Sequence, residues 1–134
     1  ERDEYLTTVV YGVIDPKTGV ALVGDAGHPP MLIVTDKGEV RTVDAGPEAT
    51  PLGVADDRTE IEITLAPGET LLAYSDGLVE QKGRSFDEGQ DQLLEVIGGV
   101  PVSPLGAFCK QVVDVMITGI SPFDDVTLLA IHRD

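Results

Sequence analysis

Residues 71–80 read LLAYSDGLVE, in which an apolar, strand-like run meets Ser75, Asp76 and Gly77 before the apolar pattern resumes. A carboxylate at the end of a strand is held in place by a rigid element. The glycine after it lets the backbone bend sharply and leaves room beside the carboxylate. This stretch therefore predicts a buried strand that presents Asp76 at the edge of a sheet.

The residues before this stretch predict antiparallel strands joined by tight turns. Turn sequences rich in Asp, Lys and Gly separate runs of β-branched and apolar residues, a pattern typical of two hairpins. These strands are expected at residues 5–14, 20–26, 31–34 and 39–43. Residues 44–58 show no periodicity and are predicted to form a loop.

Alternation returns just ahead of the opening stretch. The apolar residues of IEITL at 61–65 share one face of a predicted strand, and the turn sequence APGE follows it. We therefore expect this strand to pair with the strand of residues 71–74. The first half of the chain would then be a meandering antiparallel sheet.

The hydrophobic period changes to that of a helix after residue 84. Ser85 stands three residues before Glu88, which predicts a capping box, and the apolar spacing suits a helix to about Ile97. Gly98 and Gly99 are expected to stop it.

A second helix is predicted with Ser103 as its cap and Pro104 as its first helical residue, ending at Gly119. Its predicted buried residues are Leu105, Phe108, Cys109, Val112, Val113 and Met116. The sequence VTLLAIH at 126–132 predicts a last strand that rejoins the sheet. The expected fold class is therefore α+β, as one domain or part of one.

The composition is acidic: 24 Asp and Glu against 9 Lys and Arg give a formal net charge of −15. Such a surface repels nucleic acid and anionic membranes, and it suits divalent cations. The single cysteine, Cys109, cannot form an internal disulfide and is expected to be a buried structural thiol, which fits the cytoplasm. The sequence has neither an 18-residue apolar run nor the pattern of a signal peptide.

Asp124 stands just before the last predicted strand, as Asp76 stands just after an earlier one. If the two strands are neighbours, their carboxylates converge, and carboxylates converge mainly where a cation neutralises them. Oxygen ligands suit Mg²⁺ or Mn²⁺, and two ions roughly 3.5–4 Å apart can activate a water for phosphate-ester hydrolysis. Taken singly, however, Ser-Asp-Gly is a common turn, and Asp124-Asp125 is a common solvated loop or cap.

Four sequence motifs of this chain are similar to motifs of a known family: AGHPP at 26–30, TPLGV at 50–54, LAPGETLLAYSDGLVE at 65–80 and DDVTLLAI at 124–131. In this order they resemble the SpoIIE/RsbU branch of the metal-dependent PPM serine/threonine phosphatases. The resemblance implies an antiparallel β-sandwich flanked by helices. It implies Asp76 and Asp124 as ligands of Mg²⁺ or Mn²⁺, with Asp124 favoured over Asp125. It also implies a bacterial regulator that dephosphorylates an anti-sigma-factor antagonist protein.

Two polar residues in the AGHPP region have simpler roles as alternatives to chemistry. His28 could act as an acid for a leaving group, but its place among turn residues favours ordering of the connection. Asp25 stands where relatives often carry Asn and is expected to cap that turn.

The family carries two earlier acidic motifs that this chain lacks, so residues 1–134 resemble the C-terminal part of a phosphatase domain. With two ligands alone, affinity for Mg²⁺ should be poor. Uncovered sheet edges are expected to make the isolated chain self-associate or depend on a partner fragment.

Three functional hypotheses follow. The first is a piece of a protein-serine/threonine phosphatase that is inactive or weakly active alone. The second is a phosphatase-like binding or regulatory module that has lost catalysis. The third is an unrelated α+β domain whose acidic residues are ordinary surface groups.

Overall fold

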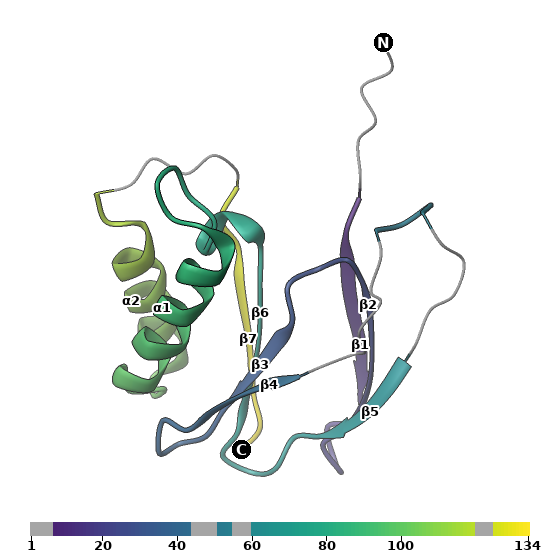
Figure 1. Cartoon of the computed structure of the whole chain (residues 1–134). Helices are drawn as coiled ribbons and strands as arrows, with labels where there is room; N and C mark the ends of the chain where they lie inside the picture. The colour runs from purple at the N-terminus through teal and green to yellow at the C-terminus, as the bar shows by residue number, and fades with distance from the viewer. Residues whose placement is uncertain (1–6, 44–50, 55–59, 120–124) are drawn as a thin grey trace.

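Two antiparallel sheets and a pair of helices make up the computed structural model (Figure 1). It describes residues 7–43, 51–54, 60–119 and 125–134. The strands are β1 (Val9–Ile14), β2 (Val20–Ala26), β3 (Met31–Val34), β4 (Val40–Val43), β5 (Glu60–Thr64), β6 (Thr70–Tyr74) and β7 (Leu128–His132). The helices are the short 3-10 helix η1 (Asp76–Leu78), α1 (Phe86–Gly99) and α2 (Leu105–Ile117).

The strands form one sheet in the order β1-β2-β5 and another in the order β4-β3-β6-β7. All pairings within both sheets are antiparallel. Both long helices lie against the second sheet (Figure 1), so the layers are sheet, sheet and helices. The predicted α+β sandwich and its two hairpins are confirmed.

The predicted pairing of β5 with β6 is wrong. Strand β5 pairs with β2, whereas β6 lies between β3 and β7 in the other sheet. The turn at 66–69 therefore carries the chain from one sheet to the other instead of closing a hairpin. The reason lies in burial: β5 has one half-buried face, which suits an edge strand, whereas nearly every residue of β6 is buried, which suits a central one.

Each face of the second sheet supplies a separate core. Leu32 and Val34 of β3 pack toward the helices, whereas Ile33 packs between the sheets. The alternation of side chains along a strand explains why all four residues of β3 are buried. The helix-side core also contains Tyr74, Leu78, Leu93, Ile97, Phe108, Val112 and Met116.

Helix α1 begins as predicted. The Ser85 hydroxyl accepts a hydrogen bond from the Glu88 N–H at 3.2 Å, and the Glu88 carboxylate accepts one from the Ser85 N–H at 3.0 Å. The predicted end at Ile97 is two residues early, since the helix continues through Gly98 and Gly99. Its ladder tolerates the glycines, which cost stability without breaking hydrogen bonds.

Helix α2 begins one residue later than predicted. Pro104, with an extended backbone, is the N-cap, so Ser103 is not the cap. The Pro104 carbonyl accepts the hydrogen bond from the Phe108 N–H at 3.1 Å. Of the predicted inward residues, Phe108, Val112 and Met116 are buried, and Leu105, Cys109 and Val113 are half-buried against the same core.

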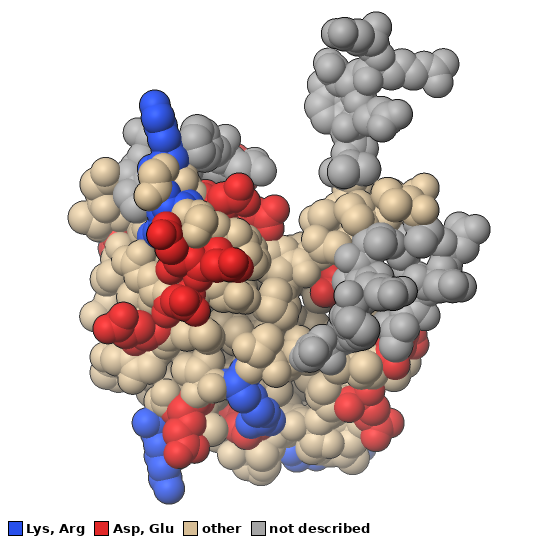
Figure 2. Space-filling model, in the orientation of Figure 1, with Lys and Arg blue, Asp and Glu red and all other residues tan. Residues whose placement is uncertain are grey.

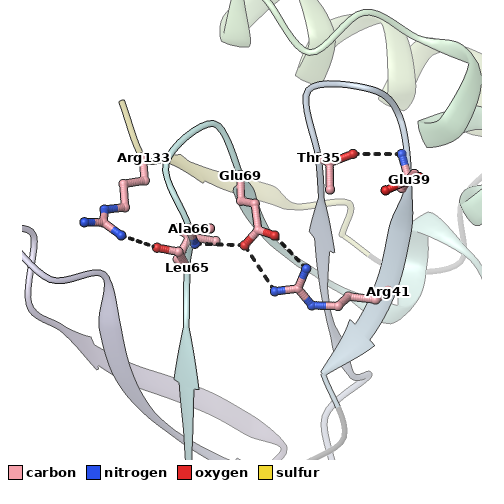
Figure 3. Close-up of polar contacts among 7 residues, drawn as sticks. All are labelled: Thr35, Glu39, Arg41, Leu65, Ala66, Glu69 and Arg133. Atoms are coloured by element: carbon pink, nitrogen blue, oxygen red, sulfur yellow. Dashed lines mark hydrogen bonds and ion pairs between the residues drawn. The ribbon is translucent and has the colours of Figure 1, made fainter.

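Hydrogen bonds fasten the end of the molecule at which β6 begins (Figure 3). Arg41 on β4 donates to both carboxylate oxygens of Glu69, at 2.7 and 3.1 Å. Arg133 donates to the carbonyl of Leu65 at 2.7 Å and to that of Lys17 at 2.9 Å. Arg133 thus ties the segment after β7 to the β1–β2 turn and the end of β5, which belong to the other sheet.

Several large apolar side chains are exposed on three strands. They are Tyr11, Val13, Leu22, Leu129 and Ile131. Leu129 and Ile131 of β7 line, with residues of β1, a groove of about 160 Å³ between the sheets. None of the described helices covers the outer face of β1-β2-β5 (Figure 1).

Acidic side chains gather over the helical side of the face in Figure 2. The exposed acidic residues of α1 are Asp87, Glu88, Asp91 and Glu95. Among the described helices, none has the length and apolar character needed to span a bilayer.

Candidate functional site

Asp76 lies at the end of β6, as the sequence predicts. Ser75 leaves the strand with an extended backbone, and Asp76 opens η1 with its side chain exposed. The Asp76 carbonyl accepts hydrogen bonds from the N–H groups of Val79 at 3.0 Å and Glu80 at 2.8 Å. A short, closed turn on a buried central strand therefore presents a solvent-facing carboxylate.

Gly77 is buried in the middle of η1. It is not among the glycines with a left-handed φ. The sharp turn after Asp76 therefore does not depend on the conformational freedom of glycine, contrary to part of the sequence argument.

Strands β6 and β7 are neighbours, which was the condition for Asp76 and Asp124 to converge. Their register pairs Tyr74 with Leu128, so the end of β6 that leads to Asp76 lies beside the start of β7. Asp124 itself lies outside the described residues. The convergence of the two carboxylates stays a prediction.

Ser75 fastens the segment that enters β7. Its N–H donates to the Thr127 carbonyl at 3.0 Å, and its hydroxyl accepts from the Thr127 N–H at 2.8 Å. The hydroxyl also donates to the Asp125 carbonyl at 3.0 Å. Ser75 thus joins, by hydrogen bonds, two segments that lie about fifty residues apart in the sequence. Asp125 lies at this end of the sheet, and its side chain is exposed.

The carbonyls that follow Asp76 accept hydrogen bonds from two side chains that the sequence argument did not single out. The buried amide of Gln81 donates to the Gly77 carbonyl, and Arg84 donates to the carbonyls of Leu78 and Val79, each at 2.9 Å. The Gln81 amide oxygen is buried and has no hydrogen-bond partner among the described residues. No sequence signal marks Gln81 or Arg84, since these partners are backbone carbonyls.

Helix α1 packs directly on the turn. A Cβ at Gly89 would lie 1.8 Å from the Val79 carbonyl oxygen, so only glycine permits this approach. One residue on, Gln90 donates to the Tyr74 hydroxyl at 3.1 Å. Burial raises the pKa of Tyr74, the bond from Gln90 opposes this, and the nearby charge of Asp76 adds to the rise.

The hydrogen bonds of the AGHPP region fit the simpler of the roles considered. The Asp25 carboxylate accepts from the His28 N–H at 2.8 Å, and His28 Nδ1 lies 3.0 Å from the Pro29 carbonyl. Both contacts order the connection between β2 and β3. Cys109 is half-buried on α2, and burial raises the pKa of its thiol, which disfavours a nucleophilic thiolate.

The described residues supply some of the ligands that a divalent cation needs. Asp76 supplies a hard, exposed oxygen ligand on a rigid support. No group of three or more His, Cys, Asp or Glu side chains that could hold a metal occurs within residues 7–43, 51–54, 60–119 and 125–134. Further ligands would have to come from other residues, Asp124 first.

Comparison with known proteins identifies the family. The model of the family described as stage II sporulation protein E (SpoIIE) matches residues 2–134. Protein IcfG from Synechocystis sp. is 26% identical over 130 residues, covering 95% of this chain and 20% of that protein.

Solved structures share the fold. The RsbU and RsbW domains of Rv1364c from Mycobacterium tuberculosis superpose with a TM-score of 0.86 and 30% identity, over 94% of this chain and 36% of that one. The phosphatase domain of the cell fate determinant SpoIIE from Bacillus subtilis gives a TM-score of 0.76 and 20% identity, over 96% of this chain and 56% of that domain. This chain therefore spans only part of each of these three proteins.

Proposed function

This chain belongs to the SpoIIE family, in the SpoIIE/RsbU branch of PPM-type phosphatase domains, and from that premise we propose that it forms the C-terminal part of a protein-serine/threonine phosphatase domain. Residues 1–134 would supply one side of the metal centre. The proposed substrate is a phosphoserine or phosphothreonine on a bacterial signalling protein, an anti-sigma-factor antagonist, in the cytoplasm.

In this proposal Asp76 and Asp124 would hold Mg²⁺ or Mn²⁺, and the ion would supply the activation of water that phosphate-ester hydrolysis needs. The protein's own part is positional: β6 and its closed turn orient Asp76, and Ser75 fastens the segment entering β7. The presoaking of the Bacillus subtilis domain with Mn supports the choice of metal.

The pairing of β6 with β7 is the observation that carries the proposal. It sets the last residue of β6, two residues before Asp76, beside the first residue of β7, four residues after Asp124. The two acidic residues are 48 apart in the sequence numbering, and this pairing brings the strand ends next to them to one end of one sheet.

The direct test is release of phosphate from a phosphoserine protein by the complete domain of the parent gene, with and without Mn²⁺. We expect activity that depends on Mn²⁺ and is lost in Asp76→Asn and Asp124→Asn, and little activity from the 134-residue chain alone. Asp36→Asn is the matched control, because Asp36 is an exposed turn residue at the other end of the second sheet. Full activity in both site variants would overturn the ligand roles of Asp76 and Asp124, whereas a complete domain that releases no phosphate with Mn²⁺ would favour a binding module.

The exposed apolar residues of β1, β2 and β7 support a second part of the proposal, that the isolated chain self-associates. Sedimentation velocity across a concentration series should show dimers or larger species. Val13, which is 72% exposed on β1, is the first residue to replace, and Val13→Ser should shift the distribution toward the monomer. A chain that is monomeric at every concentration would contradict this part alone.

A further inference from the structure

Arg84 connects the turn that carries Asp76 to both long helices. Its guanidinium donates to the Leu78 and Val79 carbonyls, each at 2.9 Å, and to the side chain of Gln92 on α1 at 3.0 Å. It also donates to the Met116 carbonyl, in the last turn of α2, at 3.1 Å. Four hydrogen bonds from one half-buried side chain thus meet three separate elements.

The partners of Arg84 explain why an arginine suits this place. The last carbonyls of a helix lack partners within it and carry the negative end of the helix dipole. Arg84 satisfies one such carbonyl on α2 and two others that follow Asp76. A planar guanidinium can serve all of them from one rigid fork, whereas a lysine ammonium is a point charge on a flexible stem.

The link from Arg84 to Asp76 runs through Val79. The Val79 N–H donates to the Asp76 carbonyl at 3.0 Å, and the Val79 carbonyl accepts from Arg84 Nε at 2.9 Å. The backbone N–H of Val79 is therefore bonded to Asp76, and the backbone carbonyl of Val79 is bonded to Arg84. Releasing Arg84 frees one end of Val79 and weakens the bond that closes the turn at Asp76.

We propose that Arg84 is a positioning residue for Asp76, and that through Met116 it makes the orientation of the Asp76 carboxylate depend on the last turn of α2. This rests on the proposed function, in which Asp76 is a metal ligand. Arg84 touches neither metal nor substrate in this proposal. A displacement of α2 by a partner would change the affinity for the cation through Arg84.

Arg84→Lys is the test variant and Arg133→Lys the matched control. Arg133 is also a half-buried arginine that donates to two backbone carbonyls, but it lies beyond the far end of β6. Two quantities are measured by NMR on the 134-residue chain. They are the hydrogen-exchange rates of the Val79 and Glu80 amides, and the Mn²⁺ concentration that half-broadens the amide signals of residues 75–80.

In Arg84→Lys we expect both exchange rates to rise about tenfold, the size expected for loss of one charge-assisted hydrogen bond. We expect the Mn²⁺ concentration for half-broadening to rise severalfold. After correction for any change in global stability, Arg133→Lys should change neither the amide exchange rates nor the Mn²⁺ concentration for half-broadening by more than about twofold. If Arg84→Lys fails to fold, Gln92→Ala removes one of the four bonds from an exposed position and should shift both readouts in the same direction by less.

The outcomes separate the two proposals. Exchange rates or Mn²⁺ broadening that are the same in the Arg84→Lys and Arg133→Lys chains would overturn the positioning role alone. Absence of broadening near residue 76 in the unsubstituted chain at any Mn²⁺ concentration would overturn the metal site in this chain, and the positioning role with it.

Discussion

Replacing Gly89 by alanine should destabilise the chain, although alanine is the better helix former. The new Cβ would lie 1.8 Å from the Val79 carbonyl oxygen and 2.5 Å from its carbon. An ordinary contact between carbon and oxygen needs roughly 3.3 Å, so α1 and the turn must separate by about 1.5 Å. Because the obstacle is backbone and not a flexible side-chain end, no rotamer change relieves it.

The two opposing free energies can be compared. Alanine in place of glycine inside a helix contributes about 1 kcal/mol of stability. Overpacking of a buried site costs about 1–3 kcal/mol, and a backbone clash belongs at the upper end of that range. We expect a net loss of about 2 kcal/mol, which for a domain of this size lowers Tm by roughly 5–10 °C.

Thermal unfolding followed by circular dichroism at 222 nm measures this loss. The matched control is Gly106→Ala in α2, because a Cβ at Gly106 meets no atom within 4 Å. Its Tm should stay unchanged or rise by up to roughly 4 °C, since alanine gains helix propensity there without a clash. A Tm for Gly89→Ala that equals or exceeds that of the unsubstituted chain would refute the packing of α1 on Val79.

Three other predictions concern stability away from the turn. Ser85→Ala should remove the capping box of α1 and cost about 0.5–2 kcal/mol in urea unfolding, an effect that Ser85→Asp should largely restore. Arg133→Ala should cost about 2–3 kcal/mol by releasing two carbonyls that join the sheets, and a loss below about 0.5 kcal/mol would contradict that role. The hydrogen bond from Arg41 lowers the pKa of Glu69 below its ordinary 4.5, so the Glu69 carboxylate stabilises the fold above pH 4.5 and less as the pH falls through the lowered value. The difference in Tm between the chain and Glu69→Gln should therefore close under acid, and a difference that grows as the pH falls would contradict the assignment.

Local patterns in the sequence predicted most individual elements. The capping box at Ser85, the strand at 31–34 and both hairpins were readable because each depends on residues close together in the chain. The partner of β5 was not readable. Turn residues such as those at 66–69 fix where a chain reverses, but which sheet receives the next strand depends on burial across the whole fold.

The candidate site likewise contains residues that local sequence patterns predict and residues that only the folded structure reveals. The position of Asp76 at the end of a strand was predictable because a carboxylate and a glycine interrupt an apolar run. Gln81 and Arg84 were not, since nearly all of their partners are backbone carbonyls, which any residue could supply. The importance of Gly89 was likewise hidden, because a glycine in a helix reveals a close approach only when the neighbouring backbone is known.

The double burial of β3 and β6 has a consequence for how the molecule moves. Helices seal one side of these strands and the opposing sheet seals the other, so their amide protons should be among the slowest to exchange with deuterium. The carboxylate of Asp76 is attached directly beyond β6. Asp76 is therefore anchored to the part of the fold that opens last, whereas the segment entering β7 belongs to an edge strand.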